Sequence, residues 1–363
     1  MKLEQIQFVH FRNHASLTFV PSGGINLIYG PNGSGKTSIL EGIHYCALTK
    51  GFVSAYDIEC LKEGNLFFLV KGKFASESGT ETEVKVSYSR QNGKQLNVNS
   101  RNIATFSSHI GVIPCITFSP SDLSIIAGSP AERRRFLDNA ICQTDTRYLD
   151  ALLNYRRILQ QRNALLFQIR EHRSGMEMLD ILTEQIAEHA ACIVSARIRF
   201  IREILPLTEA NLVAVSAGET PHISYRCSFF SHDNSELPDQ LSRLFKERIR
   251  EKRQEEISRA QTAIGPHRDD LLFFLNEKEI KKYASQGQKR SFIITLKLAL
   301  YRYFLDKLDE QPICLFDDLF SELDHHRVDA LLLLLSGFGQ SIITTTEKRE
   351  IAGVSALNIC EIA

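Results

Sequence analysis

Along the first 120 residues, short apolar stretches alternate with polar residues, and this period of about two predicts β-strands. The predicted strands cover residues 3–11, 16–20, 25–29, 65–74, 82–89, 96–98 and 112–118. Over residues 36–48 the apolar positions recur at helical spacing instead. This part of the chain therefore predicts a mixed α/β fold.

After Pro130 the pattern changes to long helices with few helix breakers. The predicted helices cover residues 131–142, 148–170, 178–205 and 241–259. A turn near Ser174 and Gly175 joins the second of them to the third, so these two are expected to form a hairpin. Residues 216–238 predict loops around a short strand at 223–227.

The last hundred residues return to an α/β pattern. Strands are predicted at 261–264, 271–275, 313–316 and 341–345, and helices at 286–308 and 324–335. The fold class predicted for the whole chain is α/β with a mostly helical segment inserted in the middle.

Composition narrows the class of protein further. The chain has 363 residues, and 43% of them are hydrophobic, which is enough for a large core in two or three domains. Lys plus Arg and Asp plus Glu both number 43, so DNA binding would need local basic clusters. The eight cysteines form no C-x-x-C pair. The longest apolar run, 330–335, is too short to cross a bilayer, so we expect a cytoplasmic protein without a membrane partner.

Residues 30–37 read Gly-Pro-Asn-Gly-Ser-Gly-Lys-Thr and fit the phosphate-loop pattern G-x-x-x-x-G-K-[ST]. The loop follows a predicted strand and opens a predicted helix, which is the context that this motif requires. Its glycines let backbone N–H groups surround a phosphate at the helix N-terminus. We expect Lys36 to reach the β- and γ-phosphates and Thr37 to bind Mg²⁺. The predicted nucleotide-binding residues are Gly30, Pro31, Asn32, Gly33, Ser34, Gly35, Lys36, Thr37 and Ser38.

Two acids, Asp317 and Asp318, follow the apolar strand at 313–316. Because ligands bind at the carboxyl ends of strands in open α/β sheets, these acids can complete the phosphate site from the other side. We expect Asp317 to hold Mg²⁺ and Asp318 to orient or activate the attacking water, with Lys36 as the second catalytic residue. The alternative is that the acids only cap the following loop.

Asp317 lies 281 residues after Lys36, far more than one βαβ crossover needs, so a large segment is inserted within one nucleotide-binding head. Ahead of the second half, residues 284–290 form a polar, glycine-containing turn that opens an apolar helix. This turn resembles the signature motif of ATP-binding-cassette (ABC) ATPases. The resemblance implies that Ser285, Gly287 and Gln288 contact the γ-phosphate held by a second copy. The alternative is a simple helix N-cap by Ser285.

Together these features resemble the RecF family of bacterial recombination mediators, a relative of SMC heads, over essentially the whole chain. The matching stretches are Phe11-Arg12-Asn13, the phosphate loop with Leu40-Glu41, residues 118–123, 128–130, 133–138 and 264–271, the Ser285 turn, and Ser321-Glu322-Leu323-Asp324. The resemblance implies an ABC-type P-loop ATPase head made of residues 1–129 plus 260–363, and a helical arm of residues 130–259.

The resemblance also implies a function. The cofactors would be ATP and Mg²⁺, and the protein would form an ATP-dependent homodimer with weak, DNA-stimulated ATPase activity. Its partners would be gapped duplex DNA or single-strand/double-strand junctions, together with RecR and RecO, and it would aid recombinase loading. Arg12 would lie near the nucleotide, although an ordinary surface arginine is the alternative.

Three departures from other ABC ATPases have consequences. Asp318 stands where many of these enzymes have a longer glutamate, so we expect slow hydrolysis. Residues 342–346 contain no histidine, so a hydroxyl must fill the position that senses the γ-phosphate. Residues 119–123 contain no glutamine for a Q-loop.

Candidate DNA contacts are the basic residues of three clusters, and each cluster also has the alternative of a solvated, ion-paired helix face. They are Arg133, Arg134 and Arg135; Arg156, Arg157, Arg162 and Arg170; and Lys246, Arg248, Arg250, Lys252 and Arg253. His267 and Arg268 belong to a family motif, with a structural turn as the alternative to catalysis. Three other function classes are weaker: a transport-coupling ATPase, an architectural SMC-like head, and a P-loop kinase.

Overall fold

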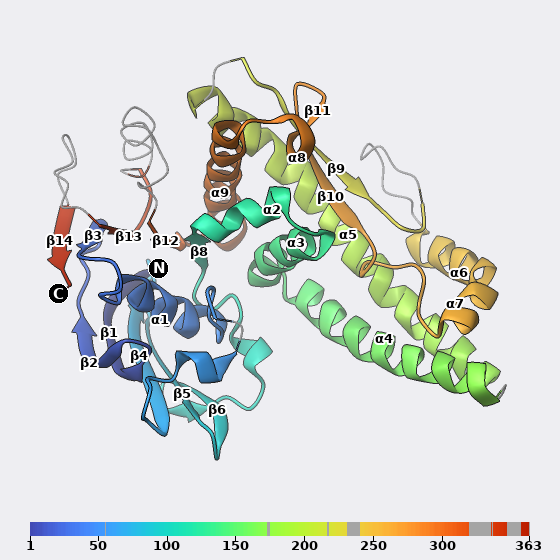
Figure 1. The fold of residues 1–363 in the computed structure, drawn as a ribbon, viewed down its shortest axis with the longest axis horizontal. Helices are drawn as coiled ribbons and strands as arrows, with labels where there is room; N and C mark the ends of the chain where they lie inside the picture. The colour runs from blue at the N-terminus through green and yellow to red at the C-terminus, as the bar shows by residue number, and fades with distance from the viewer. Residues whose placement is uncertain are drawn as a thin grey trace. The chain divides into compact units, whose positions relative to one another are not determined.

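The computed structural model describes residues 1–54, 56–172, 175–215, 218–230, 240–318, 335, 337–346 and 357–362. By its internal contacts the chain divides into two compact units (Figure 1). Unit 1 comprises Met1–Asp122 and Lys297–Ala363, and unit 2 comprises Leu123–Leu296. These borders place residues 260–296 in unit 2. The functional division into a head and an arm at residues 129/130 and 259/260 stays a prediction.

Unit 1 contains a five-stranded parallel sheet with the strand order β14-β3-β13-β12-β8. Its strands are β3 (Ile25–Tyr29), β8 (Cys115–Phe118), β12 (Ile313–Phe316), β13 (Ser341–Thr345) and β14 (Leu357–Glu361). Strands β12 and β13 are buried along their whole length, and β12 is a continuous apolar run, as expected for parallel strands that are covered on both faces. Three of them were predicted at these positions, and β8 begins later than the predicted 112–118 because Pro114 precedes it.

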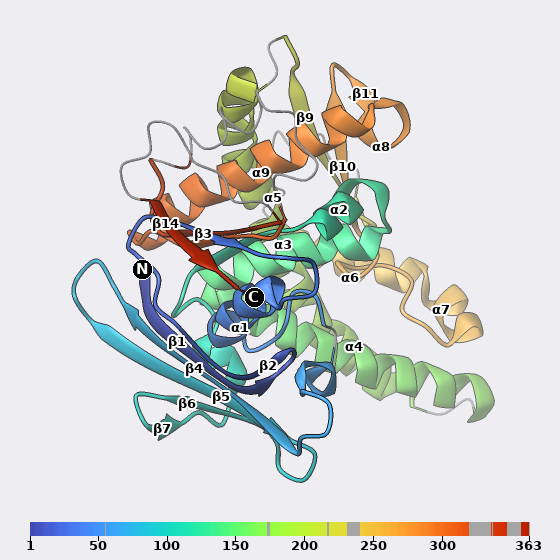
Figure 2. The same ribbon diagram turned by 60° about the vertical axis from the view of Figure 1, so that its left-hand side comes forward.

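The second sheet of unit 1 is antiparallel and six-stranded, in the order β2-β1-β4-β5-β6-β7 (Figure 2). Its strands are β1 (Lys2–Phe11), β2 (His14–Phe19), β4 (Phe67–Ala75), β5 (Glu81–Ser89), β6 (Gly93–Val98) and β7 (Arg101–Asn102). The strands predicted at 65–74 and 82–89 are confirmed as β4 and β5. Buried residues recur at every second position along much of both strands, so one of their faces lies toward the core.

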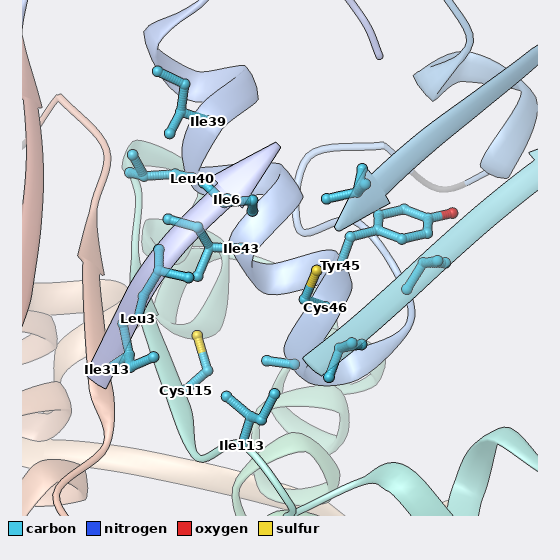
Figure 3. Packing of buried hydrophobic residues seen from close by; sticks show 14 of the residues in the cluster. Leu3, Ile6, Ile39, Leu40, Ile43, Tyr45, Cys46, Ile113, Cys115 and Ile313 are labelled. Atoms are coloured by element: carbon cyan, nitrogen blue, oxygen red, sulfur yellow. The ribbon is translucent and has the colours of Figure 1, made fainter. Parts of the chain in front are cut away.

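Helix α1 (Lys36–Leu48) contacts strands of both sheets, so that one core joins all three elements (Figure 3). Ile39, Leu40 and Ile43 of this helix lie in the same cluster as Leu3 of β1 and Ile313 of β12. Because α1 is buried on nearly every side, its first turn is fixed relative to the carboxyl ends of the parallel strands. The short 3-10 helices of this unit are η1 (Asp57–Cys60), η2 (Phe106–His109) and η3 (Pro120–Leu123), which ends across the border.

Unit 2 is mostly helical. Its helices are α2 (Ser124–Ala127), α3 (Pro130–Thr144), α4 (Thr146–His172), α5 (Met176–Val215), α6 (Leu241–Glu251), α7 (Arg253–Arg259) and α8 (Ile280–Tyr283). Helices α4 and α5 pack together as the predicted hairpin. A small sheet, in the order β11-β10-β9, is formed by β9 (Pro221–Arg226), β10 (Asp270–Leu275) and β11 (Lys278–Glu279). Helix α9 (Gln286–Leu308) has the bounds that the sequence predicts. The division between the units, at Leu296 and Lys297, falls within this helix.

Three predictions for the helical region need correction. The strand predicted at 261–264 is absent, because side chains of neighbouring helices take its backbone groups: Asn163 accepts from the Thr262 N–H and Glu256 from the Ala263 N–H, both at 2.8 Å. Helix α5 does not stop before Pro206 but continues through it, with buried Leu212 beyond. The helix predicted at 241–259 is divided at Lys252.

The helix predicted at 324–335 and the motif Ser321-Glu322-Leu323-Asp324 lie outside the described residues. No helix in the described part of the chain combines the length and hydropathy needed to cross a membrane.

Candidate functional site

The phosphate loop connects β3 to α1, and its backbone requires glycine. Gly33 and Gly35 have φ values of 85° and 97°, in the left-handed region that other residues avoid. A Cβ on Gly35 would also lie 2.7 Å from the ring of His14. Since Gly35 is the N-cap residue of α1, the loop delivers N–H groups and the helix N-terminus to one spot, where an anion can bind.

Lys36 is buried at the start of α1 and lies along the loop. Its ammonium group donates hydrogen bonds to the carbonyls of Gly30 and Pro31, at 2.8 and 2.7 Å. The ammonium thus lies beside the first two residues of the loop that is predicted to hold phosphate. The direct contact of Lys36 with the β- and γ-phosphates stays a prediction.

The acids that follow β12 meet the phosphate loop. The Thr37 hydroxyl donates a hydrogen bond of 2.7 Å to Asp317 Oδ1, across 280 residues of sequence. Strand β12 pairs with β8 and β13, and the Asp317 N–H donates to the Phe118 carbonyl at 2.8 Å. The structure therefore brings together the two residues that the sequence singles out for Mg²⁺. Both present hard oxygen atoms, the donor type that Mg²⁺ prefers.

Thr344 of β13 connects the two acids. Its hydroxyl donates to Asp317 Oδ1 at 2.9 Å and accepts from the Asp318 N–H at 3.0 Å. Asp318 adopts a φ of 49°, which is uncommon for a residue other than glycine. A single hydroxyl thus fixes the carboxylate of one acid and the backbone of the other, at the strand end where the sequence lacks a histidine.

The turn between β1 and β2 lies against the phosphate loop. Asn13 Nδ2 donates to the Gly33 carbonyl at 2.8 Å, and His14 Nε2 is 3.0 Å from the Gly35 carbonyl. Burial lowers the pKa of His14, so the ring is neutral near pH 7 and donates through Nε2. Arg12 forms an ion pair with the buried Glu41, so it is not an ordinary surface arginine.

These residues line one cavity of about 1150 Å³. Gly33, Gly35, Lys36, Thr37 and Ser38 line it from the loop and α1, with Asn32 ahead of them. Arg12, Asp317, Asp318, Thr344 and Thr346 complete the predicted part of the wall, and Pro120 lines it from the segment after β8. Gly30, Pro31 and Ser34 belong to the loop but are not among the lining residues.

Five residues of the segment 59–64, which no sequence pattern predicts as part of the site, line the same cavity. The Arg12 N–H donates to the Cys60 carbonyl at 2.8 Å, and Lys62 Nζ donates to the Asn13 carbonyl at 2.9 Å, so the segment is held beside the β1–β2 turn. No motif in the sequence marks this segment as part of a binding site. Its only sequence feature is Gly64 next to charged residues, and in the structure this glycine has a φ of 78°.

The charges of the wall limit what can bind. Acidic residues outnumber basic residues in the wall of the cavity. The acids are Glu59, Glu63, Asp317 and Asp318, and the bases are Arg12, Lys36 and Lys62. A polyanion therefore needs the backbone N–H groups of the loop and an accompanying cation. Among the described residues no group of three or more His, Cys, Asp or Glu could hold a metal ion by itself, so such a cation would share the phosphate oxygens as ligands.

The signature turn belongs to unit 2 and begins α9. Gln288 Oε1 accepts from the Ser285 N–H at 2.8 Å, and Ser285 Oγ accepts from the Gln288 N–H at 3.2 Å. This reciprocal pair of hydrogen bonds is a capping box, so Ser285 is the N-cap of α9, as the alternative in the sequence analysis expected. Ser285 is exposed and Gly287 half-buried, and Gln288 also donates to Glu219 at 2.7 Å. The contact of these residues with a second copy's nucleotide stays a prediction.

Two of the arginines offered as DNA contacts are buried. Arg133 forms a bidentate ion pair with Asp270, at 2.7 and 2.9 Å, and Arg162 pairs with Glu256 at 2.6 Å. Because each is at most 5% exposed, neither can reach a DNA backbone, and this part of the prediction is wrong. Burial also lowers the pKa of His267 to about 4; its Nδ1 is 2.6 Å from the Tyr155 hydroxyl, which supports the structural alternative for that turn.

The third basic cluster is also largely neutralised. Lys246 and Arg250 contact Glu184 of α5, at 2.6 and 3.1 Å, and Arg253 pairs with Asp180. Arg248 forms an ion pair with Glu251 of the same helix, and Lys252, between α6 and α7, forms one with Glu255 of α7. These contacts describe a solvated helix face that is cross-linked to α5.

Comparisons with known proteins agree with this geometry. A family model described as an AAA domain matches residues 5–327. The DNA replication and repair protein RecF of Chlorobium limicola is 60% identical over 361 residues, which cover 99% of this chain and 99% of that protein.

Two solved structures are informative. One, of the recombination mediator protein RecF-ATP in the RecFOR pathway, gives a TM-score of 0.91 at 31% identity and covers 96% of this chain and 93% of that one. An Smc head bound to the C-winged helix domain of ScpA gives a TM-score of 0.56 at 16% identity, covering 95% of this chain and 90% of that one. The second likeness concerns the fold alone. The fold class is therefore α/β, with the P-loop ABC-type ATPase head that SMC heads share and a mostly helical insertion.

Proposed function

The chain belongs to the RecF family, and from that premise we propose that it is an ATP-dependent recombination mediator. In this proposal ATP joins two copies of the chain, and the dimer binds gapped duplex DNA or a single-strand/double-strand junction. The dimer then aids the loading of a recombinase together with RecR and RecO. Slow, DNA-stimulated hydrolysis separates the copies again. An AAA-type ATPase domain covering most of the chain supports the activity.

The observation that carries the proposal is the contact between Thr37 and Asp317. A phosphate loop alone describes many nucleotide-binding proteins. Here the loop meets an acid that lies beyond a long insertion, and the two halves enclose one cavity with both charged and hydroxyl groups. This is the arrangement that phosphoryl transfer from a nucleoside triphosphate requires.

The residues of the cavity divide the chemistry between them. The loop N–H groups and the α1 N-terminus bind the phosphates, and Lys36 exchanges its contacts with the Gly30 and Pro31 carbonyls for phosphate oxygens. Asp318 orients the attacking water and accepts its proton, while Thr344 fixes Asp318 through its backbone N–H. Since the Asp318 side chain is one methylene shorter than glutamate, the water is held less well and hydrolysis is slow.

The residues present fit a Mg²⁺ ion. Thr37 Oγ1 and Asp317 Oδ1 lie 2.7 Å apart and would hold it, directly or through water. When bound, the ion neutralises charge on the phosphate oxygens, which the excess of acids in the wall makes necessary.

Ser285 supplies the remaining part of the proposed site from a second copy. It is exposed at the N-terminus of a 23-residue helix, and Gly287 in the first turn lets a phosphate approach the backbone. Each copy would then complete the other's γ-phosphate site, so ATP would act as a switch for dimerisation before it acts as a substrate.

The test is the rate of ATP hydrolysis per chain, measured against protein concentration with and without gapped duplex DNA. A shared site predicts a rate per chain that rises with concentration and rises further with gapped duplex. The variant Asp318→Asn should still bind ATP but should hydrolyse it at least about 100-fold more slowly. A rate per chain that is independent of concentration and of DNA would contradict the proposal.

A further inference from the structure

Glu41 is a carboxylate in an unusual place. It lies on α1, one turn beyond the phosphate loop, and its side chain is completely buried. Burial raises the pKa of Glu41, while Arg12 and the N–H of Ser54 favour its ionised form. A buried charge of this kind is retained only when other groups satisfy it. The partners of Glu41 therefore indicate what it does.

Both carboxylate oxygens have partners, and both partners lead to Arg12. Glu41 Oε2 accepts from Arg12 Nη1. Glu41 Oε1 accepts from the Ser54 N–H at 3.0 Å, and the Ser54 hydroxyl in turn accepts from Arg12 Nη2 at 2.9 Å. The guanidinium is thus held on one side by a carboxylate and on the other by a hydroxyl that the same carboxylate positions.

The backbone around these residues is shaped for the same contact. A Cβ on Gly51 would lie 2.1 Å from Glu41 Oε1, so the loop after α1 can approach the carboxylate only with glycine there. Arg12 itself has a φ of 49°, and its N–H donates to the Cys60 carbonyl at 2.8 Å. Two separate loops therefore hold Arg12 in one position at the wall of the cavity.

We propose that Glu41, with Ser54, is the positioning residue that aims Arg12 at the phosphates of the bound nucleotide. This inference rests on the proposed function, because it takes a nucleoside triphosphate as the ligand. Glu41 and Ser54 use two of the five N–H groups of the guanidinium, and within the described part of the chain no hydrogen bond takes up the other three, which can donate to phosphate oxygens. Glu41 does not touch the nucleotide itself and acts only through Arg12.

A double-mutant cycle with ATPγS and Mg²⁺, read by isothermal titration calorimetry, tests this directly. Arg12→Ala and Glu41→Gln should each weaken ATPγS binding about tenfold, and the double variant should be no weaker than Arg12→Ala alone. Ser54→Ala should weaken binding less, by about threefold, and only when Arg12 is present. A purely structural role would lower the melting temperature but would leave the effects of Glu41 and Arg12 additive.

Three controls make every outcome informative. Glu83→Gln breaks the ion pair between Glu83 and Lys71. Neither of these residues lines the cavity, so the affinity for ATPγS should be unchanged. If Glu41→Gln does not fold, the cycle between Ser54→Ala and Arg12→Ala decides, and additive effects there overturn the inference. Absence of ATPγS binding by the wild type, or unchanged binding by Lys36→Met, would instead refute the proposed function itself.

Discussion

At the scale of single residues, the hydroxyl of Thr344 contacts both acids of the site, Asp317 and Asp318. It contacts the carboxylate of Asp317 and the N–H of Asp318, so removing it takes one hydrogen bond from each of these two half-buried residues. Such a loss costs about 1–3 kcal/mol. The role of this hydroxyl cannot be read from the strand pattern, because apolar and hydroxyl residues fit β13 equally well.

We predict that Thr344→Val lowers kcat by about ten- to a hundredfold with less than a threefold change in ATP affinity. Thr344→Ser keeps the hydroxyl and should retain most of the activity. Steady-state hydrolysis and ATPγS titration of both variants provide the measurement. Loss of activity in the serine variant but not in the valine variant would show that the methyl group, and not the hydroxyl, is what matters.

His44 gives a prediction for the pH dependence of stability. It is buried in α1, where burial lowers its pKa from 6.5 to about 4, and its Nδ1 donates to the Lys50 carbonyl at 2.7 Å. The unfolded chain therefore binds a proton below pH 6.5 that the folded chain takes up only near pH 4. Its contribution to stability is complete above pH 6.5 and is lost as the pH falls toward 4.

Between pH 7 and 5 this single group should remove about 2 kcal/mol from the free energy of unfolding. Urea denaturation followed by circular dichroism suits a chain without tryptophan. The difference between wild type and His44→Gln isolates this residue from the other histidines. Parallel pH profiles for the two proteins would contradict the assignment.

The residues of the site were predictable to different extents. The phosphate loop has a motif whose spacing is dictated by phosphate geometry, and Asp317 and Asp318 follow from the rule on strand ends. The segment 59–64 has no such rule, because its place beside Arg12 depends on hydrogen bonds between two loops. Arg133 and Arg162 look like surface charges in the sequence, since nothing local reveals their buried partners.

At the scale of elements, the long helices were predicted well because their hydrophobic period extends over many residues. The segment 261–264 fails for the opposite reason. It is short and β-prone, and side chains from α4 and α7 take hydrogen bonds that a strand partner would otherwise have made. Such tertiary competition lies outside any local pattern.

The same junction supplies a prediction about the helical hairpin. Arg162 of α4 donates to Glu256 at 2.6 Å and to Thr262 at 2.8 Å, and both charged side chains are almost fully buried. Arg162→Met should therefore destabilise unit 2 by about 3–5 kcal/mol, because Glu256 would keep a buried charge without a partner. Arg248→Gln is the matched control, since its pair with Glu251 is exposed, and should change stability by less than about 1 kcal/mol.

Denaturation curves of the two variants provide the comparison. DNA affinity, measured well below the melting temperature of each folded variant, should be unchanged by Arg162→Met. Weaker DNA binding with unchanged stability would return Arg162 to the list of DNA contacts.

At the scale of the whole molecule, the chain has no net charge, and many basic residues of unit 2 are already paired with acids. Sequence-independent DNA binding depends on unpaired positive charge near the phosphates. A monomer is therefore expected to bind DNA weakly, and a dimer that brings two sets of surfaces together is expected to bind it better. In this account nucleotide controls DNA binding by controlling dimerisation.

The most direct test of that claim is sedimentation velocity of the wild type with and without ATPγS and Mg²⁺, beside Lys36→Met and Ser285→Arg. We expect a dimer of the wild type that requires the nucleotide. Both variants should stay monomeric, although of the two only Ser285→Arg should still bind ATPγS. A nucleotide-dependent dimer of undiminished stability in both variants, or a wild-type chain that stays monomeric while saturated with ATPγS, would contradict it.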